Sequence, residues 1–174
     1  MPMISKIVLG AVLTTIFAAF VVAPAMATGP ASWQHVVSSS VTSTNDNTST
    51  LSIVASDNIP RHTGVLGGFA WVYANGPSQV FVAVTHSGVR DSNQNPDGWH
   101  THNVNLAFGI SPGSNACITG LSDTTTSGLS IHGNTLSVNV RNSELTGTLS
   151  SNAAAFTIVA DSGCAGTGLG VDLS

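Results

Sequence analysis

Histidines are the side chains of this sequence with the clearest capacity for chemistry, because neutral imidazole is a common metal ligand. Six are present. His100 and His102 are separated by one residue, so on an extended strand they point to the same side. Val104, Leu106 and Phe108 share that side. We therefore expect the two histidines to lie on the core-facing side of a strand.

A third histidine, His86, joins this pair when the preceding apolar segment is considered. His86 is in phase with the alternating valines of that segment, Val80 to Val84. If the two segments form an antiparallel hairpin with matched apolar faces, His86 lies opposite or diagonal to His100 and His102. A one-residue slip of register, or a bulge, would send His86 to the other face and destroy the cluster.

Three imidazoles in this arrangement predict a metal site with three nitrogen ligands and one open position. Copper and zinc both accept imidazole, and copper binds a given site more tightly. Asp91 or Asp97, in the following loop, could serve as a fourth ligand or as a hydrogen-bond acceptor for a ligand histidine. The alternative is that each clustered histidine makes one backbone hydrogen bond and binds no metal. The remaining histidines, His35, His62 and His132, are interpreted as ordinary polar residues.

Short β-branched runs, separated by Gly, Asn, Asp, Pro and Ser, must position these side chains, and no 3.6-residue apolar period is present. The pattern predicts an all-β, single-domain fold, either an antiparallel β-sandwich or a small Greek-key barrel with eight or nine strands. Asn75-Gly76 is typical of a hairpin turn and joins strands expected at 65–74 and 79–86. Segment 38–50 is either a loop or a strand edge. The other expected strands are 33–37, 51–55, 99–108, 116–121, 129–131, 135–140 and 153–160.

The first 27 residues are predicted to be a cleaved secretory signal peptide, followed by a secreted β domain at 28–174. Lys6 precedes an apolar run at 7–22, Pro24 interrupts that run, and Ala25-Met26-Ala27 is typical of a cleavage site. The rival interpretation is an uncleaved membrane anchor, but the run is short for a span of ~20 residues. Cleavage after Ala27 places the protein outside the cell or on its surface.

Two cysteines, Cys117 and Cys164, would enter an oxidising compartment, and an even pair there most simply forms one disulfide. The alternative is a thiolate metal ligand. Blue-copper centres combine a cysteine with two histidines and usually a methionine, and all three methionines precede residue 28. We therefore interpret the cysteines as structural. Asn47-Thr48-Ser49 is a possible glycosylation sequon.

Charge limits the classes of partner. Only 7% of residues are charged, and Lys+Arg 4 stand against Asp+Glu 8, which gives a net charge of −4. Nucleic-acid binding needs a basic patch that this chain lacks, and so does adhesion to an anionic membrane surface. We expect no nucleic-acid partner and no membrane association after signal cleavage. The partner classes that this composition leaves open are a second copy of the chain and a cell-surface partner.

The run from Gly98 to Asn103, Gly-Trp-His-Thr-His-Asn, resembles the Gly-Phe-His-Val-His-Glu run of copper-zinc superoxide dismutases. In that family both histidines are copper ligands on a Greek-key β-barrel with one disulfide. The wider stretch, Val80 to Leu106, is similar to the CHRD (chordin-type) domain pattern through Phe81 to Thr85, Gly88 and Trp99 to His102. The resemblance implies that His100 and His102 are candidate copper ligands. The small, Ser/Thr-rich format also resembles uncharacterised secreted surface proteins of archaea.

The dismutase pattern also has a zinc loop and a late copper-binding histidine, whereas only His132 follows His102 here. The sequence therefore favours a secreted or cell-surface β module with a copper or zinc site at His86, His100 and His102, rather than an enzyme. No catalytic residue is assigned. One alternative is a structural or adhesive cell-surface domain without metal. A second is a metal-dependent enzyme of dismutase-like type that uses the open metal position.

Overall fold

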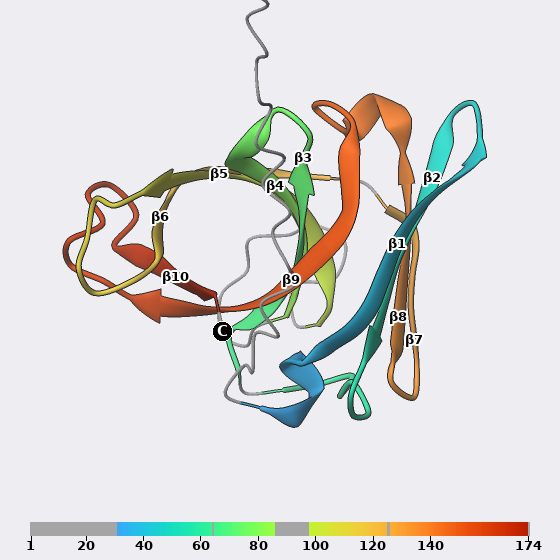
Figure 1. The fold of residues 1–174 in the computed structure, drawn as a ribbon, viewed down its shortest axis with the longest axis horizontal. Coiled ribbons are helices and arrows are strands. Elements are labelled where there is room, and N and C mark those ends of the chain that lie inside the picture. Colours follow the sequence, from blue (N-terminus) through green and yellow to red (C-terminus); the bar gives the residue numbers. More distant parts are fainter. Residues whose placement is uncertain (1–30, 64, 86–97, 125, 174) are drawn as a thin grey trace, which may run out of the picture.

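A closed barrel and a four-stranded sheet make up the protein in this computed structural model, which describes residues 31–63, 65–85, 98–124 and 126–173 (Figure 1). Every neighbouring pair of strands is antiparallel, and the predicted all-β fold is confirmed. The sheet has the order β1-β2-β8-β7, with strands β1 (Val36–Asn45), β2 (Thr48–Ala55), β8 (Thr135–Arg141) and β7 (Thr126–His132). The barrel has the order β10-β6-β5-β4-β3-β9, with strands β10 (Leu169–Leu173), β6 (Ala116–Asp123), β5 (His100–Phe108), β4 (Gly76–Thr85), β3 (Gly67–Tyr73) and β9 (Leu149–Ala160).

Helix is limited to two short 3-10 turns in the described residues, η1 (Ser32–Gln34) and η2 (Asn142–Glu144). No helix in this part of the chain has the length and apolar character needed to cross a membrane.

The first core lies between the sheet and the outer face of the barrel, in a sandwich-like arrangement. Buried and partly buried residues alternate strictly along β2, as expected of a strand with one face in a core. Aromatic side chains of β3 and β4 fill the barrel side of this layer. Its largest fully buried members are Trp71, Tyr73, Phe69, Phe81, Leu51, Ile53 and Leu136.

The second core fills the inside of the barrel, where the strands present the opposite set of side chains. Val80, Val82 and Val84 of β4 meet Val104 and Leu106 of β5 there. Strands β3 and β4 therefore bury both faces, which explains their near-continuous apolar sequences. The two cores share these strands as a common wall.

The predicted hairpin between β3 and β4 is confirmed, and Gly76 has the positive φ of 123° that the turn chemistry anticipated. The undecided segment 38–50 forms most of β1 and the beginning of β2. The strand expected at 33–37 is wrong at its beginning, because residues 32–34 form η1 and β1 begins at Val36. The strand β10 was not predicted, since its five residues follow a glycine-rich segment with little alternation.

A disulfide links Cys117 of β6 to Cys164, which follows β9, as the sequence predicted. Both cysteines are buried, and the bond spans a sequence separation of 47 residues. It fastens the turn after β9 to the strand that β10 must meet, because Cys117 is also the register partner of Gly170. The disulfide therefore holds together the place where the barrel closes.

Asp161 reinforces the same closure with hydrogen bonds. Its carboxylate accepts from Ser114 Oγ at 2.6 Å, from Ser111 Oγ at 2.8 Å and from the Gly163 backbone N–H at 2.9 Å. These donors, Ser114 foremost, lower the pKa of the Asp161 carboxyl below its ordinary value. The ionised carboxylate thus ties the loop before β6 to the turn before β10.

Removal of the disulfide should destabilise the domain. On the chain-entropy model, closing a loop of this length raises the free energy of the unfolded state by about 4 kcal/mol. The double variant Cys117→Ala, Cys164→Ala should lose about that much free energy of unfolding in urea titrations. Reduced wild-type protein is the matched control and should behave like the double variant. A loss below about 1 kcal/mol would contradict this role for the bond.

The Asp161 cluster should make stability depend on acid pH. A lowered pKa in the folded state contributes stability that is present above the ordinary value of about 4 and lost as pH falls through the folded value. Asp161→Asn should therefore lower the melting temperature at pH 7, and its difference from wild type should shrink toward pH 2. Asp46→Asn, at the exposed β1–β2 turn, is the control. A constant difference between Asp161→Asn and wild type from pH 7 to pH 2 would refute this account.

Candidate metal centre

Strand β5 places His100 and His102 inside the barrel. Val84 is the register partner of His100, and Val82 is the partner of His102, without a register shift along this ladder. Since the valines belong to the barrel core, the predicted orientation of the two histidines is confirmed. Phe108 is a correction to the predicted core face, because it lies at the end of β5 and is 44% exposed.

The opposite face of β5 holds the strand in position through buried polar contacts. The Thr101 hydroxyl is 2.6 Å from the Thr124 hydroxyl. Asn103 accepts a hydrogen bond from the Tyr73 hydroxyl at 2.5 Å and donates to the Glu144 carbonyl at 2.8 Å. Satisfied buried polar groups of this kind fix a unique arrangement. The backbone that carries the two histidines is therefore fixed from its other side.

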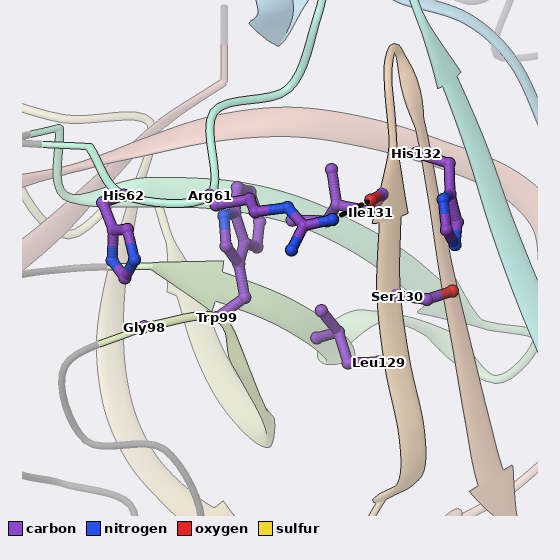
Figure 2. A pocket seen from close by; sticks show the side chains of 8 residues that line it. All are labelled: Arg61, His62, Gly98, Trp99, Leu129, Ser130, Ile131 and His132. Atoms are coloured by element: carbon purple, nitrogen blue, oxygen red, sulfur yellow. Dashed lines mark hydrogen bonds between the residues drawn. The ribbon is translucent and has the colours of Figure 1, made fainter.

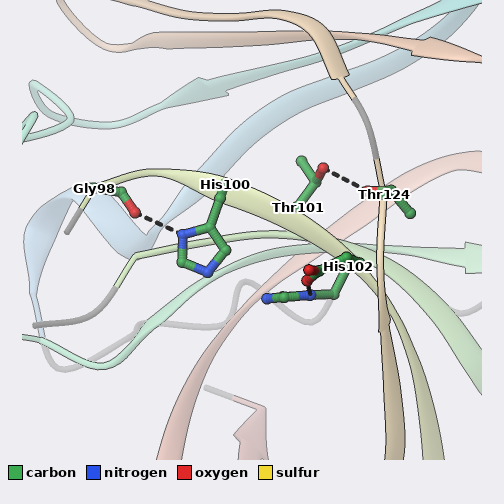
Figure 3. Close-up of polar contacts among 6 residues, drawn as sticks. Gly98, His100, Thr101, His102 and Thr124 are labelled. Atoms are coloured by element: carbon green, nitrogen blue, oxygen red, sulfur yellow. Dashed lines mark hydrogen bonds and ion pairs between the residues drawn. The ribbon is translucent and has the colours of Figure 1, made fainter. Parts of the chain in front are cut away.

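The two imidazoles lie close together in the barrel interior. Each histidine is only 3% exposed. Their ring centroids are 4.9 Å apart and the rings are nearly perpendicular, at 86°. Figure 3 shows both rings on the same side of β5, while Thr101 points away from them toward Thr124. The pair thus forms a compact, largely dry group of nitrogens.

Each ring has an oxygen next to its Nδ1 atom. His100 Nδ1 lies 2.8 Å from the Gly98 carbonyl oxygen, which can only accept, so Nδ1–H is the donor. His102 Nδ1 lies 3.1 Å from Asp123 Oδ1 without the geometry of a hydrogen bond, and the negative charge of a carboxylate at this distance favours a proton on that nitrogen over a lone pair. In neutral imidazole the other nitrogen, Nε2, then carries the lone pair. Both rings consequently present Nε2 in the form that binds a metal ion.

Asp123 was not identified from the sequence. It reaches His102 because the two residues are direct partners in the β5–β6 ladder, and its side chain remains 43% exposed. The ladder contains a register shift between Asn105 and Leu106, which simple alternation does not reveal. A carboxylate behind a ligand histidine is the arrangement that orients and strengthens such ligands in known metal sites.

Other predicted site residues lie elsewhere or outside the described residues. His86, Asp91 and Asp97 fall in the segment 86–97, which the structure does not describe. His62 and His132 are exposed, His35 is half-buried, and Asn47 lies exposed in the β1–β2 turn. Within residues 31–63, 65–85, 98–124 and 126–173, no three His, Cys, Asp or Glu side chains form a metal-binding group. The described part of the predicted site therefore consists of the neighbouring pair His100 and His102.

Comparisons with known proteins add no family to this geometry. No family model matches the chain, and neither a curated protein nor a solved structure matches it significantly.

The tautomers of the two histidines provide a test without metal. In apo protein above pH 7.5, long-range ¹H–¹⁵N spectra should show Nδ1–H protonation for both His100 and His102, because oxygen atoms lie next to those nitrogens. Asp123→Asn should perturb the His102 resonances and leave the His100 tautomer unchanged. Exposed His132 is the internal reference. Nε2–H protonation of both rings in wild-type protein would contradict this geometry.

Proposed function

We propose that this chain is a secreted or cell-surface β module that binds a copper or zinc ion through Nε2 of His100 and His102. The observation that carries the proposal is the pairing of each Nδ1 with an oxygen, Gly98 O for one ring and Asp123 Oδ1 for the other. In both rings Nε2 then carries the lone pair, and the ring centroids lie 4.9 Å apart. A copper or zinc ion bound there would supply Lewis acidity at its open position.

His86 is the proposed third ligand. It follows Thr85, the last residue of β4, in the sequence, and Val84 is the register partner of His100. The alternation that motivates His86 holds for the described residues Val80, Val82 and Val84, all of which face the barrel interior. Asp91 and Asp97 remain candidate fourth ligands or acceptors.

Location and partners belong to the same proposal. The disulfide is consistent with an oxidising compartment, which supports secretion after removal of residues 1–27. The low charge gives no support to a nucleic-acid partner. In this setting the module would hold its ion while the polar, hydroxyl-rich surface keeps it in solution or contacts a cell-surface partner.

Metal titration of purified, tag-free protein tests the proposal. Copper(II) or zinc(II) should bind near one equivalent by calorimetry and elemental analysis. His102→Ala and His100→Ala should each weaken binding by at least tenfold, because each removes one nitrogen ligand. His132→Ala is the matched control and should bind like wild type. Metal content near zero in correctly folded wild-type protein would sink the proposal and favour the metal-free structural module.

His86→Ala separates the third ligand from the pair. If His86 is a ligand, this variant should also weaken binding by at least tenfold, whereas wild-type affinity would limit the site to the described pair. Binding should also weaken in acid, since ligand imidazoles must be neutral and protons compete with the metal. Affinity that does not change with pH would argue against histidine ligands altogether.

A further inference from the structure

A surface pocket lies outside the barrel, with Trp99 in its wall. It is a pocket of about 360 Å³ between the loop that follows β2 and strand β7. Figure 2 shows Arg61 extending across it, with His62 and Trp99 on one side and Leu129 and Ile131 on the other. The side chains of Ser130 and His132 lie on the opposite face of β7, as alternation requires.

The described lining of the pocket carries one permanent positive charge, Arg61, in a protein that has few cations. Arg61 and Arg141 are the two basic residues among the described parts of the chain that carry a permanent charge. None of the described residues that line the pocket is acidic. The guanidinium of Arg61 donates one long hydrogen bond, from Nη2 to the Ile131 carbonyl at 3.4 Å. A guanidinium has five N–H donors in a planar fork, so most of them can turn toward a ligand.

The backbone that carries Arg61 is held at several points. Trp99 Nε1 donates to the Pro60 carbonyl at 2.8 Å, directly before Arg61. The Ile59 N–H donates to the Gly133 carbonyl at 2.9 Å, and the Ile59 side chain is 4% exposed. The Trp99 ring in turn stacks on Phe69, with centroids 5.9 Å apart and planes 12° from parallel. Such preorganisation reduces the entropy that ligand binding must remove.

The lining combines this cation with apolar surface. Leu129 is half-buried and Ile131 is 9% exposed, and both line the pocket together with Trp99. The pocket volume falls within the range typical of small-molecule sites, which are mostly apolar with a few directed polar groups.

We infer that this pocket binds a small organic monocarboxylate with an apolar body. The carboxylate would pair with the Arg61 fork, and the apolar body would lie against Leu129, Ile131 and Trp99. A free organic acid and the C-terminus of a peptide share this chemistry. The inference does not rest on the metal site. His100 and His102 face the interior of the barrel, as their partners Val84 and Val82 do, whereas Trp99 belongs to the core outside the barrel.

Binding of defined carboxylates tests the inference. Phenylacetate represents a free acid and N-acetylphenylalanine represents a peptide C-terminus, and the corresponding neutral amides are the chemical controls. Titrations followed by ¹H–¹⁵N spectra should shift the Trp99 indole resonance with at least one acid. The preferred acid should bind at least tenfold more tightly than its amide. Stronger binding of N-acetylphenylalanine than of phenylacetate would identify a peptide C-terminus as the favoured class.

Two arginine variants provide the matched comparison. Arg61→Gln should weaken the preferred acid by at least tenfold, whereas Arg141→Gln, on β8, should leave its affinity unchanged. Thermal melts of both variants verify that they are folded. Equal binding of acid and amide, equal affinities of the two variants, or no shift of the Trp99 indole with either acid would overturn the inference.

Discussion

Burial of β3 and β4 on both faces is the constraint on which the rest of the structure depends. One set of their side chains forms the core between sheet and barrel, and the alternate set fills the barrel. A slip of one residue would exchange the two sets, and put Trp71 and Phe81 into a space now filled by Ala70 and Val82. The backbones of β3 and β4 approach closely at Gly68, where a Cβ would lie 2.0 Å from the Ala83 carbonyl oxygen. Register is therefore fixed by shape as well as by hydrogen bonding.

The same constraint explains how two histidines can be held inside an apolar barrel. The register of β4 determines that of β5, and this sets which of its residues face inward. A buried imidazole is costly unless its nitrogens have partners. Gly98 O accepts a hydrogen bond from His100, and Asp123 Oδ1 offers His102 a charge contact from a partly exposed position where the carboxylate stays hydrated. The two rings are thus buried in the barrel, while the carboxylate next to one of them is exposed to solvent.

Alternation of apolar residues was enough to predict the β4–β5 pairing, the inward direction of His100 and His102, and the all-β class. An even cysteine pair was enough to predict the disulfide. The contact of Asp123 with His102 could not be predicted, because it depends on the β5–β6 ladder, where an extra residue interrupts the alternation of side chains. The pocket at Arg61 was not predicted for a different reason, since it forms where a loop after β2 meets an edge strand some 70 residues later. Local patterns carry no information about such nonlocal contacts.

Strand β10 closes the barrel with only two register pairs to β6, while its longer ladder is to β9. The barrel is consequently completed by the last strand of the described residues. The buried side chain of Gln34 also donates to the Phe156 carbonyl across a sequence separation of 122 residues. Chains whose contacts join distant segments fold slowly, because loop-closure entropy must be lost before those contacts form. During synthesis the apolar strand β3 must therefore wait for β9, its second partner, until most of the domain has emerged, and its unpaired edge is open to aggregation during that interval.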